Sequence, residues 1–360
     1  MRHLTVGLPL VGLLLMMPVT PVMAASPTPA STFCTITDPR IAGLSGLVVT
    51  DTGFISISDS NLDKSAIRIW FFDKACRVTR SIEYPTPAYD PEDMALGRDG
   101  TIYVADIGDN RQERTSIAIW RVAPGSSTPH IYRYRYPDHP HDAEALLLGA
   151  DDTPIVVTKD IGAGEIFVPT APADPSGKPV LLKRVGTFYP TVTATPTFLG
   201  IVGTTLVTGG ANSADRTMVA LRTYGDAYVW HVTNGDVVKT ITTTKPRMIP
   251  LPHEPQGESI AFDPSGEHLY TVSDQEAEPV KTKIFQYALP TPVPSVPASP
   301  AVTPTPTQTS IPTTTPAPAA VSSSPRTPPV AGIAIVAGLL LLGGIAVVML
   351  RKHYRRRTSR

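Results

Sequence analysis

Cysteine is scarce in this chain, because Cys34 and Cys76 are its only two. Two such isolated cysteines exclude a structural zinc site built from thiolates. In an exported protein, a pair of this kind forms a disulfide by default. We therefore expect a bond between Cys34 and Cys76 if the protein leaves the cytoplasm.

The motifs of several common enzyme classes are also missing. The chain has no Gly-x-Ser-x-Gly elbow, no His-Glu-x-x-His pair and no phosphate-binding glycine loop. Pro255 follows His253-Glu254 and would break a zinc-binding helix there. A metal-assisted hydrolase needs no serine elbow, so that class of enzyme stays open.

The N-terminus predicts a signal peptide over residues 1–24. Arg2 gives the segment a basic start, residues 4–19 are apolar, and small residues precede a cleavage point after Ala24. The alternative is a first transmembrane helix. Three prolines in and just after the apolar stretch leave too short a clean run for that.

The C-terminus predicts a stalk and a membrane anchor. Residues 290–329 hold 13 of the 39 prolines and favour extended polyproline II structure. Residues 330–350 carry no charge and are long enough to cross a bilayer. The basic tail at 351–360 would stay in the cytoplasm. We therefore expect a single-pass cell-membrane protein whose N-terminal domain lies outside.

The remaining segment, residues 31–289, is predicted to be the extracellular domain. It contains all 31 acidic residues but only 23 of the 31 basic ones, so its formal charge is about −8. A negative domain disfavours nucleic acid as a partner. The expected partners are the membrane, through the C-terminal helix, and an extracellular protein or small-molecule ligand.

A repeated unit runs through this domain, and helical periodicity is scarce. The unit is a strand, an Asx/Gly turn, a strand ending in a polar residue, a loop and a third strand. Unit starts at Gly46, Asp93, Glu144 and Ser259 are 47, 51 and 115 residues apart. The last gap leaves room for one more unit, at residues 210–232.

Five units of this length indicate an all-β fold, a β-propeller of about five blades, with six as the alternative. A β-sandwich is the competing architecture, but its strand spacing is shorter. The last unit lacks a fourth strand, which residues 32–37 would supply to close the ring. The bond from Cys34 to Cys76 would then link the closing strand to the first blade.

Several phrases in these repeats resemble known propeller families. Residues 43–47, 90–95 and 256–262 look like blade starts of phytase-like esterases, and are similar to lactonase and NHL-type propellers. Residues 105–111, 141–146 and 220–230 resemble exported, uncharacterised actinobacterial propellers more closely. The resemblance implies a propeller fold and carries over no catalytic residue.

Acidic residues gather at the blade starts and at the ends of second strands. Oxygen ligands of this kind suit calcium, which takes roughly six to eight of them. The predicted metal ligands are Asp59, Glu92, Asp109, Glu144 and Glu258. The alternative is structural: acidic side chains there would accept backbone N–H bonds between blades. A transition-metal site in residues 139–142 competes with a solvated loop.

Two functional classes follow from these observations. The first is a membrane-anchored cell-surface propeller acting as a binding or scaffold module, favoured by the long stalk and the missing nucleophile motif. The second is a calcium-dependent hydrolase of esters, lactones or phosphoesters, favoured by the acidic blade starts and the phytase-like phrases. The catalytic residues of such an enzyme cannot be named from the sequence.

Overall fold

The computed structural model describes residues 30–41, 43–59, 64–273 and 282–289. Helix is rare in them: one α-helix, α1 (Val237–Thr243), and two 3-10 turns, η1 (Lys64–Ala66) and η2 (Gly200–Thr205). In this part of the chain no helix is long and apolar enough to span a membrane. The expected signal peptide, stalk, anchor and tail lie outside the described residues.

The strands form five antiparallel groups of four, which we call blades and number along the chain. Within each blade the strands are given from the centre of the ring outward. Blade 1 contains β2 (Leu44–Thr50), β3 (Gly53–Ser58), β4 (Arg68–Asp73) and β5 (Val78–Glu83). Blade 2 contains β6 (Pro91–Leu96), β7 (Ile102–Asp106), β8 (Ile117–Val122) and β9 (His130–Arg135). Blade 3 contains β10 (Ala143–Leu148), β11 (Pro154–Thr158), β12 (Gly164–Pro169) and β13 (Val180–Phe188).

The last two blades complete the set. Blade 4 contains β14 (Val207–Asn212), β15 (Met218–Thr223), β16 (Asp226–His231) and β17 (Arg247–Pro250). Blade 5 contains β18 (Gly257–Phe262), β19 (His268–Ser273), β20 (Lys283–Ala288) and, as its outermost strand, β1 (Ser31–Thr35). Blade 4 therefore fills the gap that the sequence repeat left at residues 210–232.

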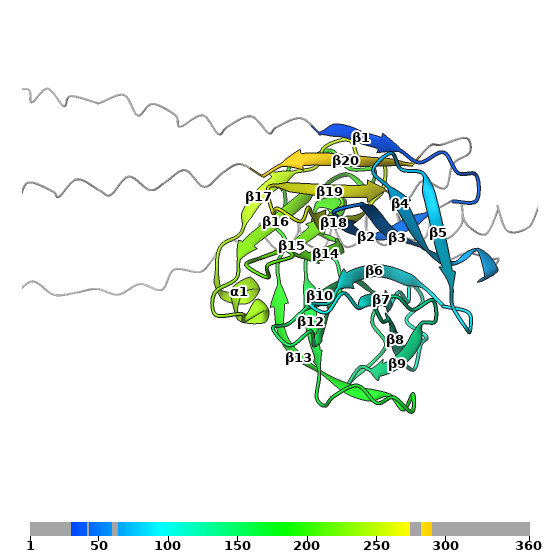
Figure 1. Cartoon of the computed structure of the whole chain (residues 1–360). Helices are drawn as coiled ribbons and strands as arrows, with labels where there is room; N and C mark the ends of the chain where they lie inside the picture. The colour runs from blue at the N-terminus through cyan, green and yellow to red at the C-terminus, as the bar shows by residue number, and fades with distance from the viewer. Residues whose placement is uncertain (1–29, 42, 60–63, 274–281, 290–360) are drawn as a thin grey trace, which may run out of the picture.

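The innermost strands close a ring. In order, β2 contacts β6, β6 contacts β10, β10 contacts β14, β14 contacts β18, and β18 returns to β2 (Figure 1). This is a five-bladed β-propeller, so the propeller prediction is confirmed, and the six-blade and sandwich alternatives are wrong. Close approach between neighbouring innermost strands needs glycine at Gly46, because a Cβ there would lie 2.9 Å from the Met94 amide nitrogen of β6.

The N-terminal strand completes the ring as expected. Strand β1 pairs antiparallel with β20, with Ser31 opposite Gln286. Cys34 on β1 forms a disulfide with Cys76, which lies in the turn between β4 and β5, and their Cα atoms are 6.0 Å apart. The covalent bond thus joins blade 5 to blade 1 at the seam where the chain closes on itself.

Burial falls from the axis of the ring to its rim. Strand β10 is buried along its whole length, since blades pack against both of its faces, whereas β5 is largely exposed. The three tryptophans, Trp70, Trp120 and Trp230, lie on third strands and are buried between blades. Such burial of large aromatic rings contributes strongly to the stability of each blade interface.

One feature of the fold was not expected. The outermost strands of blades 2 and 3 pair in parallel, with Val180 opposite Tyr134 and Leu181 opposite Arg135, so the two blades form one sheet of eight strands. Strand β13 is nine residues long and therefore extends past its own blade. Figure 1 shows it reaching toward β9 along the rim.

Candidate functional site

The second residue of each innermost strand lies at one end of the ring. In blades 2, 3 and 5 this residue is a glutamate, namely Glu92, Glu144 and Glu258. Every innermost strand shifts its register within its first four residues, and a β-bulge of this kind re-aims the side chains beside it. The three glutamates are only 2–4% exposed. We call this end of the ring the acidic end.

Three carboxylates meet in one corner of the acidic end. Oxygens of Asp59, Asp90 and Glu92 all lie within 4.8 Å of one another, and we call this group the carboxylate triad. Asp59 follows β3, Asp90 precedes β6, and Glu92 lies within β6. A Cβ at Gly108 would collide with the Asp90 and Glu92 carboxylates, so glycine at that position lets the backbone pass close to the triad.

Lys159 brings a cation to the acidic end, and it follows β11 just as Asp59 follows β3. Its ammonium forms an ion pair with Glu144 Oε1. It also lies 6.0 Å from the centre of the Tyr224 ring. Glu144 Oε2 is buried and has no hydrogen-bond partner among the described residues. The ion pair therefore uses one carboxylate oxygen of Glu144 and leaves the other oxygen without a hydrogen bond among the described residues.

The third glutamate, Glu258, accepts a hydrogen bond from a side-chain amide. Gln256 Nε2 donates a hydrogen bond of 2.7 Å to Glu258 Oε1. Glu258 Oε2, like Glu144 Oε2, is buried without a hydrogen-bond partner in the described part of the chain. Buried polar atoms are nearly always paired, so two such oxygens at one end of the ring need an explanation.

Burial and like charge act together on the carboxyl groups. Burial, and then the neighbouring charges of Glu144, Asp59 and Asp90, raise the pKa of Glu92 well above its ordinary value. Burial likewise raises the pKa of Glu144 well above its ordinary value, although Lys159 opposes the shift. The unliganded acidic end therefore tends to hold protons.

The two non-carboxyl titrating groups stay protonated. Burial alone would lower the pKa of the Lys159 ammonium, but the carboxylates around it, Glu144 first, raise that pKa well above the usual range. Burial, followed by the charge of Glu258, raises the pKa of the Tyr224 phenol. At neutral pH the site thus offers an ammonium and a phenol as hydrogen-bond donors.

Of the predicted ligands, the triad contains only Asp59 and Glu92, whereas Glu144, Glu258 and Asp109 lie outside it. The Asp109 carboxylate accepts hydrogen bonds from the Glu113 and Arg114 amides, at 3.0 and 2.8 Å. Its own amide donates to Asp142 Oδ1 at 2.8 Å. Asp109 is buried and holds the loop after β7 in shape, since its carboxylate accepts amides of its own loop and not, as the structural alternative had it, amides of a neighbouring blade.

Asp106 has a structural role beside the triad. Asp106 accepts hydrogen bonds from the Tyr89 and Asp90 amides, both at 3.0 Å, and an ion pair of 2.9 Å from Arg114. Because it holds the Asp90 amide, Asp106 helps to position the triad. Asp274, which the sequence places at the end of β19, lies outside the described residues.

Sequence reasoning missed an ion pair that supports this end of the ring. Arg222 is fully buried on β15 and lies 2.8 Å from Glu254 Oε2. Glu254 Oε1 accepts a hydrogen bond of 2.7 Å from the Tyr287 hydroxyl. A Cβ at Gly257 would collide with the Arg222 guanidinium. The sequence places Arg222 at a strand end, where it could face acidic residues of the channel, but it does not identify Glu254 as the partner.

The loop before β10 gathers two histidines and an aspartate. His139 and His141 stack with ring centres 4.2 Å apart, and His141 Nε2 lies 3.0 Å from Asp138 Oδ1. His141 is buried against Tyr136 and Phe167, so the solvated-loop interpretation is wrong for this residue. Donor atoms of Asp138, His139 and His141 lie within 4.8 Å of one another, a spacing that suits a metal ion.

Comparison with known proteins adds little to this geometry. No protein-family model matches the chain. No curated protein matches it in sequence either.

Solved structures that resemble the chain include virginiamycin B lyase from Staphylococcus aureus, with 15% identity, a TM-score of 0.34, and coverage of 71% of this chain and 68% of that one. A gluconolactonase from Xanthomonas campestris has 14% identity, a TM-score of 0.40 and coverage of 69% and 72%. A luciferin-regenerating enzyme has 12% identity, a TM-score of 0.39 and coverage of 68% and 77%. Scores at this level assign no activity to the chain.

Proposed function

We propose that the protein is a binding module presented at the cell surface, and that the acidic end of its propeller holds one calcium ion as part of the binding face. The proposal keeps the predicted anchor at residues 330–350 and the proline-rich stalk at 290–329, which would carry the propeller away from the membrane. The carboxylate triad is the observation that carries it.

The triad needs a cation for a physical reason. Burying one ionised carboxylate is costly, and burying several together is costlier still unless a proton or a metal ion compensates. Burial and the nearby charges of Glu144, Asp59 and Asp90 raise the pKa of Glu92, and a bound cation would offset this cost of holding the carboxylates together. Carboxylate oxygens are the ligands that calcium prefers.

The donor set favours binding over catalysis. Lys159 and Tyr224 keep their protons at neutral pH, so neither can act as a general base there. Both can donate hydrogen bonds to a ligand that also contacts the ion. Calcium, an ammonium and a phenol together would recognise an oxygen-rich or anionic group on a partner molecule.

One observation favours the hydrolase alternative. The raised pKa values of Glu92 and Glu144 are typical of carboxyl groups that donate or accept protons in catalysis near neutral pH. A calcium-dependent hydrolase of esters, lactones or phosphoesters would use them in this way. The phytase-like phrases at the blade starts are in keeping with this alternative.

Thermal melting of the full-length protein in detergent tests the proposal. A ligand at a hundredfold excess over its Kd stabilises the folded state by about 2.7 kcal/mol. We expect the wild type to melt several degrees higher in calcium than in chelator. Glu92→Gln should lose this difference. Glu83→Gln, an exposed glutamate on the rim strand β5, should keep it.

The outcome also separates the two functions. If calcium does not shift the melting temperature of the wild type, the calcium site is wrong. If calcium stabilises the protein and also supports turnover of an ester, a lactone or phytate, and Glu144→Gln abolishes that turnover, the hydrolase replaces the binding module. Stabilisation without turnover supports the binding module.

A further inference from the structure

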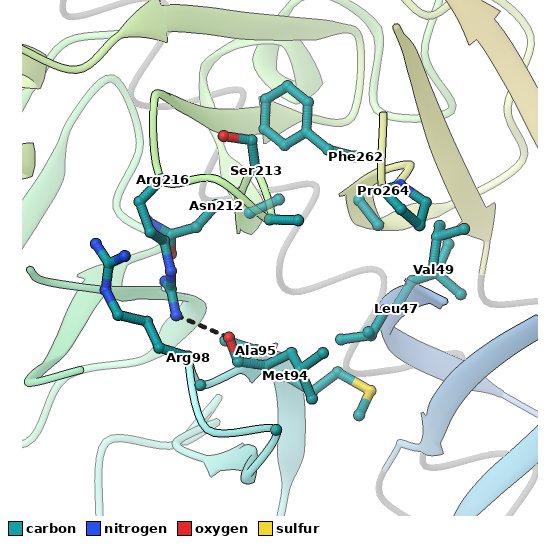
Figure 2. Close-up of a pocket in the computed structure, with 17 residues that line it drawn as sticks. Leu47, Val49, Met94, Ala95, Arg98, Asn212, Ser213, Arg216, Phe262 and Pro264 are labelled. Atoms are coloured by element: carbon teal, nitrogen blue, oxygen red, sulfur yellow. Dashed lines mark hydrogen bonds between the residues drawn. The ribbon is translucent and has the colours of Figure 1, made fainter. Parts of the chain in front are cut away.

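A cavity of about 270 Å³ opens at the other end of the ring, where the innermost strands finish. Residues from blades 1, 2, 4 and 5 line it. Figure 2 shows Arg98 and Arg216 together on one side of the cavity. The wall in that view also has apolar side chains from Leu47, Val49, Met94, Phe262 and Pro264, and polar ones from Asn212 and Ser213.

Arg216 occupies a backbone position that two other blades give to glycine. It is the last residue of the four-residue turn between the first and second strands of blade 4. The corresponding residues in blades 2, 3 and 5 are Gly100, Asp152 and Gly266, and each donates its amide to the carbonyl at the start of its turn. All four have positive φ, from 58° to 83°. Strain of this kind at non-glycine residues is common at functional sites.

The two non-glycine residues at this position contact each other. Arg216 Nη2 lies 2.8 Å from Asp152 Oδ1 and donates a second hydrogen bond, also of 2.8 Å, to the Leu96 carbonyl. The Arg216 side chain is only 8% exposed. Its Nη1 is buried without a hydrogen-bond partner among the described residues. A buried guanidinium nitrogen with no acceptor indicates that something else supplies one.

The charges around the cavity favour an anion with a single charge. Arg98 and Arg216 are the charged residues of the lining. Asp152 is outside the lining, compensates Arg216, and accepts the Arg98 amide at 2.8 Å through its other oxygen. The Arg98 guanidinium, which donates to the Ala150 carbonyl, is then the excess positive charge on the wall.

The size and walls of the cavity restrict the ligand further. Small-molecule sites in proteins range from roughly 300 to 1,000 Å³, so this cavity suits a ligand at the lower limit of size. The apolar side chains of the wall, among them Leu47, Met94 and Phe262, favour an apolar body on that ligand. Guanidinium groups bind planar carboxylates through paired hydrogen bonds.

We propose that this cavity binds a small organic monocarboxylate. The carboxylate would accept hydrogen bonds from Arg216 Nη1 and from Arg98, and its short apolar body would pack on Leu47, Met94 and Phe262. The two ends of the propeller would then have opposite preferences, one for a cation and the other for an anion. This inference does not depend on the calcium site.

Titration calorimetry with butyrate and the uncharged butyramide tests this proposal on the full-length protein. We expect butyrate to bind at least about tenfold more tightly than butyramide, the factor that one charge-assisted hydrogen bond provides. Arg216→Gly should lose this preference. The variant should still fold, because glycine occupies the same turn position in blades 2 and 5. Arg111→Gly, in the loop after β7, should bind like the wild type.

Several results would overturn the proposal. Equal affinity for butyrate and butyramide, or no binding of either, would remove the anion site. If a folded Arg216→Gly protein bound butyrate as the wild type does, the Arg216 guanidinium would not be part of the binding site. If inorganic phosphate bound as tightly as butyrate, the cavity would not require an apolar body on its ligand, which would contradict the proposal. Chelator and Glu92→Gln should leave butyrate affinity unchanged, so the failure of either site can be told from failure of the other.

Discussion

Asp93 Oδ2 accepts a hydrogen bond of 2.9 Å from the amide of Gly210, which lies two blades away. The same oxygen accepts the Leu146 amide at 2.8 Å, and Asp93 Oδ1 accepts the Met94 amide at 2.8 Å. One fully buried carboxylate therefore ties the innermost strands of blades 2, 3 and 4 together. It lies one residue beyond Glu92, between the acidic end and the cavity.

Replacement of Asp93 should destabilise the fold more than replacement of a surface aspartate. Asp93→Ala leaves three buried amides without acceptors, at a cost of about 1–3 kcal/mol each. We expect a loss of at least about 3 kcal/mol in the free energy of unfolding, measured by denaturant titration. Asp151→Ala, in the exposed turn of blade 3, should cost less than about 1 kcal/mol. Similar losses in the two variants would contradict the central role of Asp93.

The disulfide should contribute to stability through the unfolded chain. Cys34 and Cys76 are 42 residues apart, and closing a loop of that length removes chain entropy worth about 4 kcal/mol. The Cys34→Ser/Cys76→Ser double variant should lose roughly that much in a denaturant titration. It should also expose the seam between β1 and β20 to proteolysis. Two alkylatable thiols in the exported wild-type protein would refute the bond itself.

The effect of calcium should grow as the pH rises. Burial raises the pKa of Glu92 above its ordinary value of 4.5, so the folded protein binds a proton more tightly than the unfolded chain. That proton stabilises the fold fully below about pH 4.5, and the stabilisation is lost as the pH rises through the folded-state pKa. In chelator, Glu92→Gln should therefore gain stability relative to the wild type between pH 4.5 and 8. In calcium, the wild type should regain its stability at pH 8.

The opposite pH trend would exclude the proton-for-calcium exchange at the triad. The melting temperatures of both proteins, each measured in calcium and in chelator across this pH range, supply the test. A wild type that gains stability over Glu92→Gln in chelator as the pH rises would mean that the Glu92 pKa is lowered in the folded protein, not raised.

Membrane topology is tested independently of the site. The anchor at residues 330–350 and the basic tail predict that the propeller lies outside the cell. Protease added to intact cells should release a propeller fragment by cutting the stalk at 290–329. Complete protection of the propeller in intact cells, with cleavage only after lysis, would reject this topology.

Much of the fold could be predicted because each repeated unit has the same pattern of turn residues and apolar strands. Each unit has an Asx/Gly turn after an apolar strand, and the spacing of these units indicated one more unit at residues 210–232, where β15 and β16 lie. Ring closure by β1 followed from a missing fourth strand. The parallel pairing of β9 with β13 had no such signal, because it depends on how far β13 extends in space.

The candidate site was predictable only in part. The structure places Glu92, Glu144 and Glu258 at one position, the second residue of an innermost strand. The unit starts taken from the sequence aligned Glu144 with Asp93 instead, one residue out of register. Asp59 joins the triad, but Asp90 and Lys159 were missed because their roles depend on distances between blades. Asp109 was predicted as a ligand because charge is visible in a sequence, whereas its backbone partners are not.

Direct titration of calcium into the full-length protein measures whether the acidic end binds the ion. We expect one ion per chain, bound with an affinity that falls as the pH is lowered, because protons compete for the same carboxylates. Glu92→Gln should lose this ion, and Glu83→Gln should keep it. A wild-type protein that binds no calcium at pH 8, or a Glu92→Gln protein that binds it equally well, would rule out a calcium site at the triad.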